Sequence, residues 1–198
     1  MTLSPPGASL TAAGRPGGAL PLAFMKVRKV TLFNGRRFTV PQGIQRIDHR
    51  ATHGWQLRYG GTRLFSDGSP DGSGARASLA RAVRELHARI ARLPAPSRLQ
   101  RAPNENKTSD LPVGISGPLV RLRAGATVRE CSLSVSLPLY GQPPRRRSIY
   151  IGTENTYTAQ RFKRALARAI TLRDEAELAY RQDATRAKRA ASRRLRAK

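Results

Sequence analysis

The residues of this chain that can bind a phosphate group or a base edge are arginines and serines that alternate with apolar residues. From residue 130 to residue 137 the alternation is strict, with Ser132 and Ser134 on one side and Cys131 and Leu133 on the other. Residues that alternate in this way lie on opposite faces of a β-strand. Arginine can form two hydrogen bonds with a phosphate or a guanine, and a serine hydroxyl bonds either group without blocking a close approach. The sequence therefore predicts a polar sheet face suited to nucleic acid.

The polar residues that we expect on this face come from three short β-type segments in the second half of the chain. Segment 119–123 alternates apolar residues with arginines. Segment 145–151 joins three arginines to an alternating run in which Ser148 and Tyr150 face outward. The predicted binding residues of this half are Arg121, Arg123, Ser132, Ser134, Arg145, Arg146, Arg147 and Tyr150.

A similar pattern occurs in the first half of the chain. Trp55, Leu57 and Tyr59 fall on one side of an alternating segment, and Gln56 and Arg58 fall on the other. Two glycines directly after Tyr59 mark a hairpin turn into the next strand. We expect this half to supply further nucleic-acid contacts, from Arg46, Gln56, Arg58 and Arg63.

The net charge favours a polyanionic partner. Lysine and arginine total 37 against 12 aspartate and glutamate, which gives a formal net charge of +25. Each phosphate that a protein neutralises releases condensed counterions, so a surface this basic favours nucleic acid. An anionic membrane is the less favoured partner, because no run approaches 18 apolar residues and no helical segment pairs a basic face with a broad apolar one.

The elements that must position these residues occur in two similar units. Segment 40–44 (Val-Pro-Gln-Gly-Ile) returns as segment 111–115 (Leu-Pro-Val-Gly-Ile), an offset of 71 residues. Each copy is followed by short β-type runs and then by a helical segment, from about residue 75 to 93 and from about residue 158. The sequence therefore predicts an α+β fold with two small modules, each a three-stranded antiparallel sheet packed on one helix.

Composition sets the expected domain boundaries. Residues 1–24, rich in proline, glycine and alanine, are predicted to be a disordered tail without the pattern of a secretory signal, and Met25 is an alternative start. The first module spans 25–93 with an N-terminal extension, and 94–110 is a proline-bearing linker. The second module spans 111–180, and 181–198 is a basic helical tail that we expect to be solvated and to add nonspecific phosphate contacts.

The second unit resembles a known family. Tyr150-Ile151-Gly152-Thr153, with Thr156 and a following alanine-rich helix, is similar to the aromatic-aliphatic-Gly-Thr-x-x-Thr signature of the Apetala2-type (ethylene-response-factor) DNA-binding domain. The first unit resembles the first two strands of that domain through Gly43-Ile44 and Gly54-Trp55-Gln56-Leu57-Arg58.

This resemblance implies a three-stranded antiparallel sheet that lies in the major groove of DNA with the helix packed behind it. It implies a DNA-facing role for Tyr150 and Arg58 and a core role for Trp55. The family has an arginine on its third strand where this chain has Ser148, so no base preference is implied. Domains of this kind also occur in bacterial and phage proteins.

The sequence does not point to catalysis. His49, His53 and His87 lack metal-ligand spacing, so we expect no metal and no cofactor. Cys131 is the only cysteine, which excludes an intramolecular disulfide and fits the reducing cytoplasm. The expected protein is a cytoplasmic, nucleoid-associated binder of double-stranded DNA and a candidate transcription factor.

Two other functions stay open on the sequence. High arginine content and a basic tail also serve proteins that bind RNA or the ribosome, although such readers usually expose several aromatic residues on the sheet. The chain could also direct a separate nuclease or integrase to DNA. Competition of a labelled duplex by structured RNA separates the first of these from DNA binding, and co-purification with an enzyme supports the second.

Overall fold

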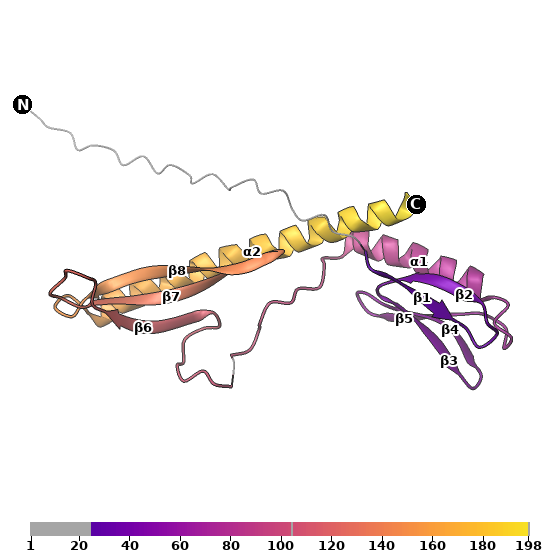
Figure 1. Cartoon of the computed structure of the whole chain (residues 1–198), viewed down its shortest axis with the longest axis horizontal. Helices are drawn as coiled ribbons and strands as arrows, with labels where there is room; N and C mark the ends of the chain where they lie inside the picture. Colours follow the sequence, from indigo (N-terminus) through magenta and orange to yellow (C-terminus); the bar gives the residue numbers. More distant parts are fainter. Residues whose placement is uncertain (1–24, 104, 198) are drawn as a thin grey trace, which may run out of the picture.

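The computed structural model describes residues 25–103 and 105–197, and the predicted tail of residues 1–24 lies outside them. This part of the chain is α+β, with eight strands in three antiparallel sheets and two helices (Figure 1). None of its helices is long and apolar enough to cross a membrane. The strands are β1 (Val27–Thr31), β2 (Arg37–Pro41), β3 (Ile44–His49), β4 (Thr52–Arg58), β5 (Thr62–Ser66), β6 (Ile115–Arg121), β7 (Glu130–Leu139) and β8 (Gln142–Thr153), and the helices are α1 (Ala75–Arg92) and α2 (Ala159–Arg196).

The sheet β3-β4-β5 packs on α1 through large side chains of β4. Trp55 and Leu57 are fully buried, and they meet Leu86 and Ile90 of the helix in one core. The indole Nε1 of Trp55 donates a hydrogen bond of 2.9 Å to the carbonyl of Ala75, so the one polar atom of this side chain is satisfied. The alternation of residues 55–59 is confirmed in β4 and the turn that follows it.

A two-stranded sheet, β1-β2, covers another part of the same inner face. The Phe38 ring of β2 meets the Trp55 ring edge to face, with centroids 5.7 Å apart, and Val40 is fully buried. A sheet must bury its whole apolar face, and here α1 buries one part of that face and the β1-β2 hairpin buries another. The sequence prediction contained no such sheet.

The sheet β6-β7-β8 packs on the first half of α2. Leu133 and Val135 of β7 and Ile149 of β8 are buried against Ala165 and Ala169 of the helix. The small alanines let the helix lie close to the sheet, as Figure 1 shows for the N-terminal half of α2. Strand parity in this unit is as the alternating serines predicted.

The second half of α2 differs from the solvated tail that the sequence predicted. The helix runs without a break for 38 residues, and Ala184, Ala187 and Ala191 are buried near its C-terminus. Ala191 joins the core of the first sheet, and Ser192 lies 2.6 Å from the Nδ1 atom of His87 on α1. The expected arrangement of two sheets in two modules is therefore not confirmed, because there are three sheets and one helix contacts both cores.

The sequence repeat has a structural counterpart. Gly43 and Gly114 both adopt positive φ angles, 103° and 78°, which favour glycine. The carbonyl of Gly43 accepts a hydrogen bond of 2.7 Å from the backbone of Arg58, and that of Gly114 accepts one of 2.8 Å from Ser136. Each Pro-x-Gly-Ile segment therefore starts the first strand of a three-stranded sheet in the same way.

Candidate nucleic-acid interface

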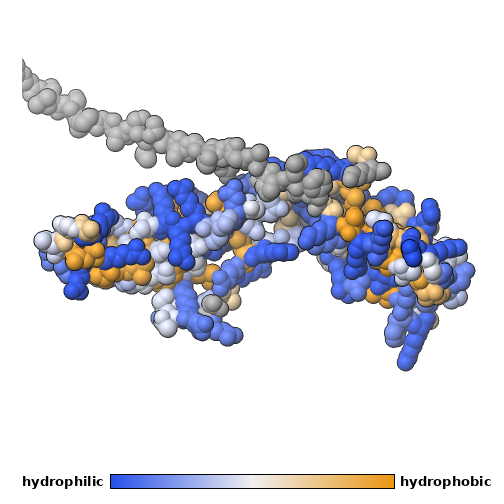
Figure 2. Space-filling model, in the orientation of Figure 1, coloured by the Kyte–Doolittle hydropathy of each residue, from blue (hydrophilic) through white to orange (hydrophobic). Residues whose placement is uncertain are grey.

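The face of β6-β7-β8 that points away from α2 carries a regular array of polar side chains. In the ladder between β7 and β8, Ser132 lies opposite Tyr150, and Ser134 lies opposite Ser148. Ser136 completes the array opposite Arg146. All of these side chains share one face because they alternate with the buried residues of each strand. The visible surface at this end of the molecule mixes hydrophilic and hydrophobic residues (Figure 2).

Tyr150 is the one aromatic residue of this array, and it is 54% exposed. Its neighbours across the ladder are small hydroxyl residues, so its ring stands above a low surface. A flat polar surface with one raised ring can approach the floor of a groove or stack on a base. The position predicted for Tyr150 is confirmed.

Arg121 reaches the same face through an irregularity in β6. The register between β6 and β7 shifts between Ser116 and Leu119, so that Leu119 pairs with Ser132 and Arg121 pairs with Glu130. Without this shift the arginine would fall on the helix side, because one residue of slip changes the face of every side chain. Arg121 is exposed, as predicted.

The charges on this face are only partly neutralised. The Nε atom of Arg123 lies 2.8 Å from a carboxylate oxygen of Glu130, and the Arg123 side chain is 74% exposed. Arg121 and Arg146 form no ion pair with any acid of the described chain. The open face therefore carries two free guanidinium groups, and Glu130 compensates the third.

Two of the predicted arginines in β8 lie on the other side of the sheet. Arg145 pairs with Leu137 and Arg147 pairs with Val135, so both have the parity of side chains that face α2. They remain exposed at the part of β8 that leads to the hairpin end. Of the three consecutive arginines, only Arg146 lies on the open face.

The open face of β3-β4-β5 has the same geometry but fewer charges. Gln56 and Arg58 point away from α1, as predicted, and the Nε atom of Arg58 donates a hydrogen bond of 2.6 Å to the Gln56 side chain. Their neighbours on β5 are Thr62 and Leu64, which is 42% exposed. This face can accept and donate hydrogen bonds, but Arg58 is its main cation.

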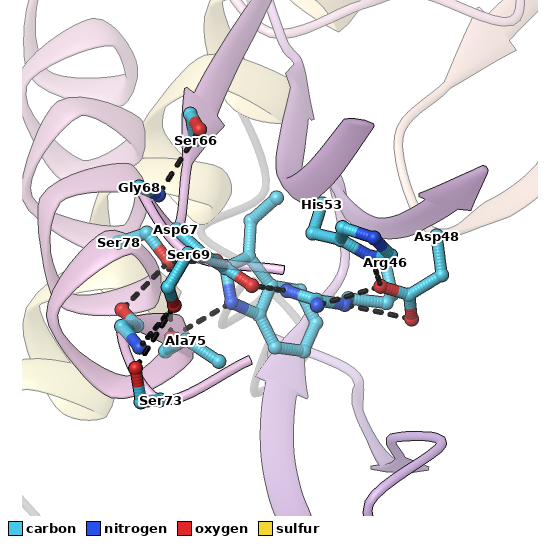
Figure 3. A network of polar contacts seen from close by, with 12 residues as sticks. Arg46, Asp48, His53, Ser66, Asp67, Gly68, Ser69, Ser73, Ala75 and Ser78 are labelled. Carbon is cyan, nitrogen blue, oxygen red and sulfur yellow. Dashed lines mark hydrogen bonds and ion pairs between the residues drawn. The ribbon is translucent and has the colours of Figure 1, made fainter. Parts of the chain in front are cut away.

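Arg46 is not on that face, which corrects the prediction. It pairs with Trp55 in the ladder, and its guanidinium carbon lies 5.1 Å from the centroid of the inward Trp55 ring. Its side chain is 7% exposed and forms ion pairs of 2.6 Å with Asp48 and 2.7 Å with Asp67 (Figure 3). Ile44 starts the strand with its side chain in the core, so alternation turns Arg46 inward as well.

Electrostatics in this network support a structural role. Burial alone would lower the pKa of Arg46, but hydrogen bonds with Asp48 and Asp67 outweigh it and raise the pKa above its ordinary value. Burial alone would raise the pKa of Asp48, but hydrogen bonds from Arg46 and His53 outweigh it and lower that pKa. Asp67 also accepts a hydrogen bond of 2.5 Å from the hydroxyl of Ser78 on α1. The network ties β3 to the loop before α1.

Arg63 also lies on the helix side of its sheet. It pairs with Leu57, and its guanidinium carbon lies 5.1 Å from the centroid of the Phe65 ring. A nitrogen of the same group is 4.0 Å from Glu85 of α1. Arg63 is 60% exposed, so it can contact a polyanion from the side but not from the open face.

Sequence reasoning missed a basic groove beside the first sheet. Lys26, which precedes β1, Arg28 of β1 and Arg58 of β4 line a cavity of about 430 Å³ together with Ile44. The Nη2 atom of Arg28 donates to the Ile44 carbonyl over 3.2 Å, which holds the guanidinium at the groove. The signal was present, because Lys26, Arg28 and Lys29 cluster in a short segment with two valines.

The described residues contain no group of three or more His, Cys, Asp or Glu side chains that could hold a metal ion. Cys131 is a buried core residue. Comparison of the chain with models of protein families, with curated proteins and with solved structures found no match.

Proposed function

We propose that this protein binds double-stranded DNA with the open face of β6-β7-β8. The observation that carries the proposal is the ladder in which Tyr150, Ser148 and Arg146 lie opposite three serines on an uncovered sheet face. Serine and arginine side chains bond phosphates and base edges, and the low relief of the face suits a two-stranded or three-stranded ribbon in a major groove. The net charge of +25 supplies the electrostatic part of the affinity.

The first sheet provides a second, weaker contact in this proposal. Arg58 and the groove that it shares with Lys26 and Arg28 can hold phosphates beside the open face of β3-β4-β5. The matching turns at Gly43 and Gly114 support descent of both sheets from one duplicated unit of Apetala2 type. Tethering two contacts on one chain raises the effective concentration of the second. A transcription factor associated with the nucleoid in the cytoplasm is the role that fits best.

A binding experiment with two matched double variants tests this proposal. Arg121→Ala/Arg146→Ala removes two charges from the open face, and Arg145→Ala/Arg147→Ala removes two charges from the other side of the same sheet. We expect the first variant to weaken duplex binding by tenfold or more, at roughly 1 kcal/mol for each contact, and the second by less than threefold. Fluorescence anisotropy with a labelled duplex measures both.

Salt dependence provides the second reading of the same assay. If six to ten phosphates are neutralised, the logarithm of the binding constant falls with the logarithm of the salt concentration at a slope of about −5 to −9. A nearly flat dependence contradicts the proposal. Equal losses of duplex affinity in the two double variants contradict it as well. Binding would then depend on the net charge of the protein and not on one face of the sheet.

RNA binding is the second candidate, and the exposed ring of Tyr150 is the observation that favours it. An aromatic ring on a sheet can stack on an unpaired base, which contributes about 1–3 kcal/mol for each base. Tyr150→Ala should then weaken binding to single-stranded RNA more than binding to a duplex. Competition of the labelled duplex by unlabelled RNA of equal length decides between the two.

A further inference from the structure

The C-terminal half of α2 forms one wall of a groove that none of the proposed contacts uses. The groove has a volume of about 480 Å³ and lies between the helix and Pro94, where the chain leaves α1. Four of the residues that line it are arginines, and none is acidic. They are Arg181, Arg186, Arg189 and Arg193.

These arginines are held on a rigid element. Ala184, Ala187 and Ala191 are buried, with Ala191 in the core of the first sheet, and the backbone of Ala95 donates a hydrogen bond of 3.0 Å to the Thr185 hydroxyl. The Nε atom of Arg189 donates to the Ile90 carbonyl over 3.4 Å. A neutral carbonyl orients the guanidinium without cancelling its charge.

Much of the charge in the groove is not neutralised. Arg181 pairs with Glu177 at 3.1 Å, and Arg186 lies 3.9 Å from Asp183. Arg189 and Arg193 form no ion pair with an acid of the described chain. Within the described residues, the four arginines of the groove therefore have only two acidic partners, Glu177 and Asp183, and neither acid lines the groove. Water screens both of these ion pairs, because Arg181 and Arg186 are exposed.

The groove faces away from the open sheet face of the proposed DNA contact. Ala169 points from α2 into the β6-β7-β8 sheet, and Arg189 follows 20 residues later on the same helix. At 100° for each residue, the two side chains point about 160° apart around the helix axis. Because Ala169 packs on the sheet, the open face lies beyond the sheet on that side of α2. A straight duplex on that face is therefore turned away from the groove.

We propose that this groove binds the phosphate backbone of a second duplex, so that one protein molecule bridges two DNA segments. The proposal rests on DNA binding by the open sheet face. The arginines from Arg181 to Arg193 span about 18 Å along the helix, which corresponds to about five base pairs of duplex. A run of guanidinium groups over this length matches a continuous polyanion better than a single anionic group.

The test measures the stoichiometry of the complex and the capture of a second duplex. An immobilised duplex is saturated with the full chain, and a fluorescent second duplex is added. Mass photometry on the free components records the mass of the complex. We expect capture of the second duplex and a species that contains one protein and two duplexes.

Arg186→Gln/Arg193→Gln is the test variant, because both residues are exposed. Arg76→Gln/Arg84→Gln removes two exposed charges from α1 and serves as the matched control. We expect the test variant to reduce capture fivefold or more, and to change affinity for the first duplex less than threefold. We expect the control to keep at least half of the capture.

The results separate the two proposals. If the wild type binds no duplex, the proposed function fails. If it binds one duplex and captures no second, or if bridged complexes always contain two proteins, only the bridging inference is overturned. Equal capture by the test and control variants also overturns it, and so does capture of an acidic peptide with an affinity equal to that for the duplex.

Discussion

Replacing Arg46 by methionine separates a structural arginine from a DNA-binding one. The Arg46 side chain is 7% exposed, and it forms an ion pair of 2.7 Å with the fully buried carboxylate of Asp67. Methionine fills much of the same volume and keeps an apolar contact with Trp55. The substitution therefore removes the charge and its hydrogen bonds while it disturbs packing as little as possible.

The expected loss follows from the burial of the partner that remains. Removing one member of a buried ion pair costs about 3–5 kcal/mol, because the other charge is left without compensation. Asp67 keeps the hydrogen bond from Ser78, and Asp48 is 28% exposed and can be hydrated, so we expect a value near the lower limit, about 3 kcal/mol. For a chain of this length, that lowers the midpoint of thermal unfolding by roughly 6 to 12 °C.

Arg58→Met is the matched control, since it removes the same group from the open face of the neighbouring strand. Circular dichroism at 222 nm follows unfolding, and anisotropy at a temperature where both variants are folded follows duplex binding. We expect Arg58→Met to change the midpoint by less than 2 °C and to weaken duplex binding. We expect Arg46→Met to lower the midpoint and to leave duplex binding unchanged. Asp67→Asn in the Arg46→Met background should recover part of the stability, because it removes the uncompensated charge.

Two results would refute this reasoning. A midpoint of Arg46→Met within 2 °C of the wild type would show that Asp67 does not need its cation. A loss of duplex binding in the folded Arg46→Met variant as large as that of Arg58→Met would return Arg46 to the interface.

Two further predictions concern the contacts of α2. Gly114→Ala should unfold at a clearly lower temperature than Gly125→Ala, because both glycines have φ of 78° but only at Gly114 would a Cβ clash with the Arg173 guanidinium, which Glu177 holds at 3.0 Å. Similar midpoints would contradict that contact. Burial, and then Arg196, lowers the pKa of His87 below its ordinary 6.5. The unfolded state then binds more protons, so stability falls as pH drops below about 6.5, and His87→Gln should weaken this dependence in denaturation curves from pH 5 to 7.5.

The open face of the second sheet could be predicted because a period of two leaves little freedom. Once Cys131, Leu133 and Val135 are buried, Ser132 and Ser134 between them must point outward. The same rule worked for Gln56 and Arg58 beside Trp55. Strand parity alone also predicts that Arg145 and Arg147 lie on the helix side. The prediction was wrong for these two because it treated the three consecutive arginines as one group of charges.

The role of Arg46 was less accessible, because the inward parity that it shares with Ile44 does not reveal what compensates its charge. Its principal partner, Asp67, lies 21 residues later in a glycine- and serine-rich loop, and nothing local marks the two as a pair. The β1-β2 sheet was missed for a related reason. Its strands are short and rich in basic residues, and their contribution to the core is made by Phe38 and Val40, which contact a tryptophan from another sheet.

The end of α2 shows how charge counting can hide packing. Ala184, Ala187 and Ala191 recur at the spacing of one helical face, which is the pattern of a close helix contact. The many arginines around these alanines led instead to the prediction of a solvated tail. A basic segment can do both, since Ala191 joins the core of the first sheet while Arg186 and Arg193 stay exposed.

The distribution of the acids explains why the proposed binding faces remain positive. The chain has only 12 acidic residues, and four of them pair with arginines whose side chains are at most 12% exposed. Asp48 and Asp67 compensate the inward Arg46, and Glu177 compensates the buried Arg173. In the described part of the chain, guanidinium groups without an ion pair then lie at Arg121 and Arg146 on one side of α2 and at Arg189 and Arg193 on the other.

This division gives acids and arginines separate functions in one structure. An ion pair in the interior fixes a loop or a helix at low exposure, where a lone charge would be costly. An unpaired arginine on a flat surface costs little folding stability, because water solvates its charge. It contributes to binding when it displaces counterions from a phosphate. Adding an acid to an open face should therefore weaken binding far more than it affects folding. The one acid already there, Glu130, sits at the end of its strand, where it leaves the serine ladder clear.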